Sequence, residues 1–188
     1  MKHIIFDLDE TLVDTSELKT YYKTGEGRIH ATRNINNLPT KIYDEKLPEI
    51  MKELQESNKV SVVTNSPCDY AVAVLRKHGF PSGTIVYGSA QKPLSGNIEQ
   101  IVKDSGIPYN QTIIVGDNTR DIVAAHGAKV PSIGVTWGSS SAEELRVAEP
   151  TRLAETTEEL EELIEKFLEG NIGYEKRKEP QNYEFLCA

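Results

Sequence analysis

The chain has 188 residues and a formal net charge of −8, with 38% hydrophobic and 27% charged residues. A chain of this length forms one domain, with room for a small insert, and buries roughly two-thirds of its unfolded surface. The composition is that of a globular protein, and no apolar run reaches the ~20 residues of a membrane span. The chain does not open with a secretory signal, and Cys68 and Cys187 form neither a disulfide framework nor a metal knuckle. We therefore expect a cytoplasmic protein with no membrane partner.

Short β-branched runs alternate along the chain with longer stretches of helical pattern. In chain order, the sequence predicts strand 3–9, helix 46–57, strand 59–65, helix 67–79, strand 84–89, helix 94–105, strand 112–117, helix 119–127 and strand 132–137. Continuous apolar runs indicate strands covered on both faces, and the alternation indicates a parallel sheet wrapped by helices. The predicted fold class is α/β, a three-layer Rossmann-like architecture with a parallel central sheet.

Polar side chains lie at the ends of four of the predicted strands or just beyond them. They are, in chain order, Asp7, Asp9, Thr64, Asn65, Lys92, Asp117 and Asp121. Ligands of open parallel sheets bind at the carboxyl ends of the strands, so we expect these side chains to converge on one edge of the sheet.

Clustered carboxylates repel one another unless they share a cation, and oxygen ligands of this kind suit Mg²⁺. Mg²⁺ in turn favours phosphate as the substrate group. One aspartate can attack phosphorus, while a second carboxylate protonates the leaving group and then activates water. Each signal alone has a plainer explanation, because an acidic turn after a strand also places two aspartates two residues apart.

The ordered set "DLDETLV", "VVTNS", "KP" and "VGDNTRD" resembles the four motifs of the haloacid dehalogenase superfamily. The match is close to its phosphoglycolate-phosphatase-like branch, and it covers nearly all of residues 1–168 apart from the segment after the first motif. The resemblance implies Asp7 as nucleophile. It implies Asp9 as general acid and base, which also gives Mg²⁺ its backbone carbonyl.

The same resemblance implies roles for the other strand-end residues. Thr64 and Lys92 match phosphate-holding positions, and Asn65 stands beside Thr64 in the second motif. Asp117 matches a metal-binding carboxylate. Asp121 matches the second acidic position of the fourth motif, which binds the metal directly or through a water.

The segment of about residues 15–46 is too short for the helical cap domain of capped relatives. We expect a short flap of one helix and a loop, with a flexible "GEG" at 25–27, over the mouth of an open site. This flap is basic within an acidic protein. As a hypothesis, Arg28 and Arg33 contact an anionic or aromatic leaving group; the alternative is a solvated loop.

Most of the negative charge lies near the end of the chain. Residues 143–169 hold ten glutamates against one lysine and two arginines, a sum of −7, and their apolar residues recur at helical spacing. We interpret the glutamates as the solvated face of a terminal helix and expect no nucleic-acid partner. The prediction divides the chain into a catalytic domain, 1–168, and a tail, 169–188, through which self-association is a further expectation.

Together these features predict a Mg²⁺-dependent phosphatase that hydrolyses a phosphate monoester through an aspartyl-phosphate. Its substrate would be a small metabolite, a nucleotide or an exposed phosphate on a macromolecule. Two alternatives stay open: a binding or regulatory module that keeps the fold and the metal site, and a phosphomutase.

Overall fold

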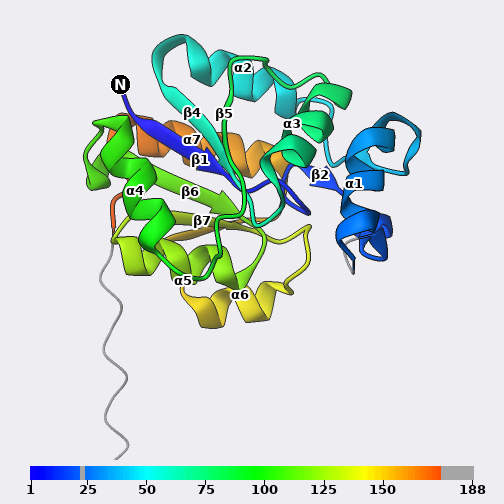
Figure 1. Cartoon of the computed structure of the whole chain (residues 1–188). Helices are drawn as coiled ribbons and strands as arrows, with labels where there is room; N and C mark the ends of the chain where they lie inside the picture. The colour runs from blue at the N-terminus through cyan, green and yellow to red at the C-terminus, as the bar shows by residue number, and fades with distance from the viewer. Residues whose placement is uncertain (22–23, 175–188) are drawn as a thin grey trace, which may run out of the picture.

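A computed structural model describes residues 1–21 and 24–174. Its centre is a six-stranded parallel sheet in the order β5-β4-β1-β6-β7-β8 (Figure 1). The strands are β1 (His3–Phe6), β4 (Lys59–Val63), β5 (Ile85–Tyr87), β6 (Thr112–Gly116), β7 (Ser132–Val135) and β8 (Arg152–Ala154). The predicted α/β fold with a parallel central sheet is therefore confirmed.

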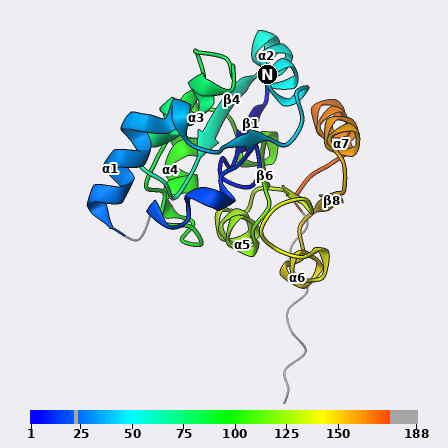
Figure 2. The same ribbon diagram turned by 90° about the vertical axis from the view of Figure 1, so that its right-hand side faces the viewer.

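Helices cover both faces of this sheet (Figures 1 and 2). One face packs against α2 (Leu47–Ser57), α3 (Cys68–Lys77) and α7 (Thr157–Glu169), and the other against α4 (Gly96–Ser105) and α5 (Thr119–Ala128). A further helix, α6 (Ala142–Ala148), packs against α5. None of the helices in the described ranges is long and apolar enough to cross a bilayer.

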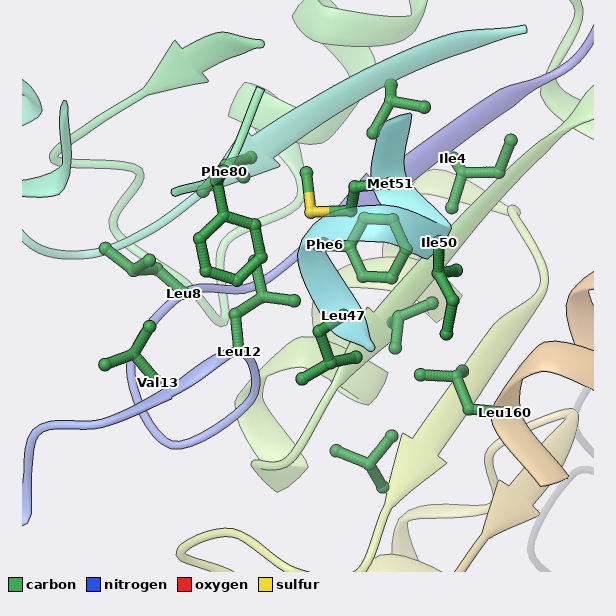
Figure 3. Packing of buried hydrophobic residues seen from close by; sticks show 14 of the residues in the cluster. Ile4, Phe6, Leu8, Leu12, Val13, Leu47, Ile50, Met51, Phe80 and Leu160 are labelled. Carbon is green, nitrogen blue, oxygen red and sulfur yellow. The ribbon is translucent and has the colours of Figure 1, made fainter. Parts of the chain in front are cut away.

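The central strand β1 is completely buried. Because side chains alternate along a strand, Ile4 and Phe6 pack with α2, α3 and α7, whereas Ile5 packs with α4 and α5. Figure 3 shows Phe6 beside Met51 of α2. Burying an aliphatic or aromatic side chain of this size contributes about 1.5–3 kcal/mol, so the chain is held firmly where β1 ends.

The structure differs from the predicted elements in two respects. β1 ends at Phe6 and not at residue 9, so Asp7 and Asp9 lie in the turn beyond the strand. The elements α6 and β8 lack a distinct sequence signal because they are only seven and three residues long.

Residues 15–46 form a small unit at the carboxyl-terminal side of the sheet. It contains η1 (Ser16–Leu18), α1 (Gly25–Asn34) and η3 (Ile35–Asn37), and it is closed by an antiparallel pair of β2 (Val13–Asp14) with β3 (Lys41–Ile42). The prediction of a flexible "GEG" was wrong: Gly25–Gly27 form the first turn of α1. The Thr24 hydroxyl accepts a hydrogen bond from the Gly27 amide at 3.0 Å and caps that turn.

At the other end of the chain, Ile172 is still buried in the core, four residues beyond the predicted domain end. The remainder of the predicted tail, residues 175–188, lies outside the described residues.

The buried His3 side chain in β1 makes the stability of the fold depend on pH. The Nε2 atom of His3 lies 2.8 Å from the Ser61 hydroxyl of β4. Burial, and then the charge of Lys59, lower the pKa of His3 from 6.5 to about 4. The unfolded chain therefore binds an extra proton between these two values, so the contribution of His3 to stability is complete above pH 6.5 and is lost as the pH falls to about 4.

We predict that, between pH 6.5 and 4, the wild type loses on the order of 3 kcal/mol more unfolding free energy than His3→Gln. Urea denaturation at each pH measures this difference. Asp7 and Asp121, whose pKa values are raised, act in the opposite direction but in both proteins, so the difference isolates His3. Parallel pH dependence of the two proteins would contradict the prediction.

Candidate active site

A cavity of about 360 Å³ opens where β1, β4 and β6 end. All seven strand-end residues singled out in the sequence line it. It holds five carboxylates and three cations: Asp7, Asp9, Glu10, Asp117 and Asp121, with Lys19, Lys92 and Arg120.

Asp7 follows β1 directly, and its backbone amide continues the sheet by donating to the Val115 carbonyl of β6 at 2.8 Å. Its carboxylate is buried and is bonded to the Lys92 ammonium group. Burial raises the pKa of Asp7 well above its ordinary value; Lys92 opposes this effect, and the neighbouring carboxylates add to it. Burial thus disfavours the ionised form of Asp7, which is the form that attacks phosphorus, and the Lys92 ammonium group partly offsets this cost.

Lys92 lies between two acidic residues. Its ammonium group contacts Asp7, donates to Asp121 Oδ1 at 2.5 Å and donates to the Val63 carbonyl at 3.2 Å. Burial alone lowers the pKa of Lys92, but the two carboxylates outweigh it and raise this pKa. Lys92 therefore supplies a permanent positive charge to the floor of the cavity.

Asn65 holds the segment that carries Lys92. Its side-chain carbonyl accepts from the Lys92 amide at 2.8 Å, and its amide nitrogen donates to the Lys92 carbonyl at 3.2 Å. The Asn65 side chain is therefore engaged with the backbone of Lys92 and positions that residue.

Asp9 has a different environment from Asp7. Four hydroxyl groups surround its carboxylate: Thr15 at 3.0 Å and Tyr70 at 3.2 Å donate to Oδ1, while Thr64 at 3.1 Å and Ser66 at 2.7 Å, both in the loop after β4, donate to Oδ2. These hydrogen bonds orient the Asp9 carboxylate toward the cavity. Of the four, only Thr64 stood out in the sequence as a site residue, because serine, threonine and tyrosine carry no spacing signal.

Asp117 is fixed at the end of β6 by residues from two loops. Thr11 donates to Oδ1 at 2.8 Å, and the amide and hydroxyl of Ser139 donate to Oδ2 at 2.7 and 2.6 Å. A Cβ atom on Gly138 would lie 2.2 Å from the Cβ of Asp117, so only glycine lets this loop approach. Neither Thr11 nor Ser139 was predicted from the sequence to be a site residue.

Asp121 lies at the start of α5 in a capping box. Its Oδ2 atom accepts from the Asn118 amide at 3.1 Å, while its Oδ1 faces Lys92. Burial raises the pKa of Asp121. A Cβ atom on Gly116 would lie 2.5 Å from the Asp121 carboxyl carbon, so Gly116 makes room for this side chain.

A divalent cation fits this arrangement. Asp7, Asp117 and Asp121 each offer a carboxylate oxygen, and these oxygens lie within 4.8 Å of one another. Hard oxygen ligands of this kind suit Mg²⁺. The Asp9 carboxylate does not belong to this group of three, and the assignment of its backbone carbonyl to the metal stays a prediction.

Comparisons with known proteins show what the chain is similar to in sequence and in fold. Residues 89–160 match a family model described as HAD-hydrolase-like. A hydrolase from Pseudomonas syringae has a similar structure, with a TM-score of 0.73 and 18% identity over 88% of this chain and 99% of that one. A haloacid dehalogenase-like family protein from Streptococcus pneumoniae gives a TM-score of 0.65 and 20% identity over 88% of this chain and 98% of its own.

Curated relatives match over a shorter stretch. The phosphoglycolate phosphatase of Vibrio vulnificus is 28% identical over 122 residues, which cover 62% of this chain and 54% of the relative. That of Agrobacterium fabrum is 37% identical over 84 residues, 42% of this chain and 36% of the relative. The chain thus spans about half the length of the curated relatives it matches.

The chain is similar to HAD-hydrolase-like proteins over residues 89–160, and its fold is similar to that of haloacid dehalogenase-like structures. Motifs that resemble those of this superfamily led to the residues at the strand ends, whereas the contacts at the rim of the cavity were not found from sequence.

At that rim the structure differs from the hypothesis about the flap. Arg28 and Arg33 are exposed on α1 and are not among the residues that line the cavity. The cations at its rim are instead Lys19, which ends η1, and Arg120 at the start of α5. The site hypothesis that rests on Arg28 and Arg33 therefore has no support from the shape of this cavity.

Proposed function

We propose that this chain is a Mg²⁺-dependent phosphatase that hydrolyses a phosphate monoester through an aspartyl-phosphate on Asp7. The observation that carries the proposal is the pairing of two differently placed aspartates at one cavity. Asp7 is buried beside Lys92. Asp9, two residues further along the chain, is held by hydroxyl groups. The relatives named as phosphoglycolate phosphatases, and a Pseudomonas aeruginosa 5'-nucleotidase 25% identical over 125 residues, support phosphate ester chemistry.

In the first half of the reaction, a carboxylate oxygen of Asp7 attacks phosphorus, and the bond from phosphorus to the leaving oxygen breaks. Asp9 gives its proton to that oxygen, so the leaving group departs as an alcohol. In the second half, Asp9 takes a proton from water, and the resulting hydroxide attacks phosphorus and releases phosphate and free Asp7.

The charge that develops on the phosphoryl oxygens needs positive partners. Lys92 and the Thr64 hydroxyl would hold these oxygens, and Asn65 would keep Lys92 in place. Asp7, Asp117 and Asp121, with the Asp9 carbonyl, would hold the metal ion, which when bound neutralises and orients the phosphate. A reducing, cytoplasmic compartment belongs to the same proposal, because Cys68 is a free, exposed thiol.

Lys19 and Arg120 would contact the leaving group of an anionic substrate. Within the described residues neither forms an ion pair, whereas Lys92 is paired with two carboxylates. Arg120 stands in the first turn of α5, where a cation disfavours the helix by about 0.3–1 kcal/mol. A position that costs helix stability supports a role in binding.

We predict that the double change Lys19→Ala/Arg120→Ala raises KM about tenfold for a phosphate ester whose leaving group carries a carboxylate, with little change in kcat. The matched control is Arg28→Ala/Arg33→Ala, which removes the same charge from exposed positions outside the cavity. Steady-state kinetics of both double variants show whether Lys19 and Arg120, or Arg28 and Arg33, contact the leaving group. A larger effect in the control would restore the original hypothesis about Arg28 and Arg33.

The direct test of the proposed function is phosphate release from p-nitrophenyl phosphate and from a panel of phosphorylated metabolites and nucleotides. We expect turnover with Mg²⁺ and none after chelation. An absence of turnover on every ester tested, in protein shown to be folded, would contradict the proposal.

A further inference from the structure

The backbone at Glu10 has an unusual conformation for its residue type. Its φ is 65°, in the left-handed region, where a residue with a Cβ is disfavoured by roughly 1 kcal/mol relative to glycine. The side chain is also 9% exposed, although a carboxylate loses solvation on burial. Contacts made by this side chain must offset both costs.

Those contacts join the two ends of the flap. The Thr15 amide donates to Glu10 Oε1 at 3.2 Å, the Thr15 hydroxyl oxygen lies at the same distance from that atom, and the Tyr43 hydroxyl donates to Oε2 at 2.8 Å. Thr15 directly follows β2, and Tyr43 directly follows β3, the two strands that pair at the base of the flap. We call Glu10, Thr15 and Tyr43 the Glu10 cluster.

The Glu10 cluster contacts Asp9 through one hydroxyl group. The Oγ1 atom of Thr15 lies 3.2 Å from Glu10 Oε1 and 3.0 Å from Asp9 Oδ1. The same Thr15 is 2% exposed, so it has little freedom to turn away. The Thr15 hydroxyl hydrogen is donated to Asp9, and the Thr15 amide is donated to Glu10. The position of Thr15, and therefore its contact with Asp9, depends on the Glu10 carboxylate that holds its amide.

We propose that Glu10 and Tyr43 are positioning residues for Asp9. They fix Thr15 at the base of the flap, and Thr15 directs the Asp9 carboxyl group toward the leaving oxygen. The inference rests on the proposed function, in which Asp9 is the general acid, and it adds that the insert following the first motif supports the general acid.

The consequence depends on the leaving group. An alkoxide needs a proton as it departs, whereas p-nitrophenolate is stable enough to leave with little help. A misdirected Asp9 therefore lowers kcat/KM for alkyl phosphates and spares kcat/KM for p-nitrophenyl phosphate, because kcat/KM reports the steps up to departure of the leaving group and not the later hydrolysis of the aspartyl-phosphate. A change that only loosens the fold would affect both substrates alike.

The test uses two variants of the full chain. Tyr43→Phe removes one hydroxyl and keeps the ring that packs against the core, and Glu10→Gly removes the carboxylate while relieving the left-handed backbone. For each we expect kcat/KM for an alkyl phosphate to fall about tenfold and that for p-nitrophenyl phosphate to stay within about twofold. The matched control is Tyr109→Phe, a tyrosine that packs in the cluster on the opposite face of the sheet and does not line the cavity.

Three results would overturn the inference. Equal losses on both substrates would make the Glu10 cluster a purely structural feature, and unchanged rates on both would leave it without a role in the reaction. If Glu10→Gly retained full activity toward alkyl phosphates, the carboxylate would not position Asp9. A wild type inactive on both esters would instead contradict the proposed function, and this inference with it.

Discussion

Replacing Asp7 by asparagine is expected to lower kcat by at least roughly a thousandfold, because the amide is a poor nucleophile toward phosphorus. The fold should persist. Burial and the neighbouring carboxylates raise the pKa of Asp7, so its ionised form is less favourable in the folded than in the unfolded chain. Ionised Asp7 therefore lowers stability near pH 7, and asparagine removes that cost. Lys92 keeps its second carboxylate, Asp121.

Two measurements on Asp7→Asn separate catalysis from folding: the rate with p-nitrophenyl phosphate, and the thermal midpoint in metal-free buffer. We expect the midpoint to be equal to or above that of the wild type. The matched control is Asp14→Asn, since Asp14 accepts from the Ser16 amide at 3.0 Å and does not line the cavity. Near-normal turnover by Asp7→Asn would contradict the role given to Asp7.

The second large effect is expected at Asp117. Asparagine at this position would turn an amide toward either the Thr11 hydroxyl or the Ser139 donors, and it would remove one of three clustered carboxylates. We expect kcat/KM at a fixed Mg²⁺ concentration to fall by at least roughly 100-fold. The Mg²⁺ concentration that gives half-maximal rate should rise as well.

A second readout for Asp117→Asn does not depend on turnover. Mg²⁺ bound to the folded chain alone raises the thermal midpoint of the wild type, and this rise should be lost in the variant. Asp104→Asn, an exposed change on α4, is the matched control. An unchanged Mg²⁺ response in Asp117→Asn would mean that the acidic group is not the metal site.

The predictable part of the site is the part that depends on strand ends. Asp7, Lys92 and Asp117 follow buried apolar runs, and parallel strands bring the ends of such runs to one edge regardless of the loops between them. The sheet and its main helices were also predictable, because continuous apolar runs and helical periodicity can be recognised in the sequence without knowledge of tertiary contacts.

The unpredicted part depends on loops and on single hydroxyl groups. Thr15, Tyr70 and Ser139 reach the site from separate segments, and nothing in their spacing indicates that they meet a carboxylate. The left-handed backbone at Glu10 was not predicted either. A glycine at this position would have indicated such a conformation, but a glutamate does not. Arg28 and Arg33 were selected for their charge alone, and α1 leaves them outside the cavity lining.

The central claim, an aspartyl-phosphate on Asp7, is tested most directly by mass spectrometry of acid-quenched protein. Asp9→Asn should slow hydrolysis of the intermediate more than its formation from p-nitrophenyl phosphate, so that variant should accumulate it. We predict one added phosphoryl group on the peptide that contains Asp7, and none when Asp7 is also changed to asparagine. Turnover with a phosphoryl group on another residue, or with no labelled protein at any time in the reaction, would contradict the account.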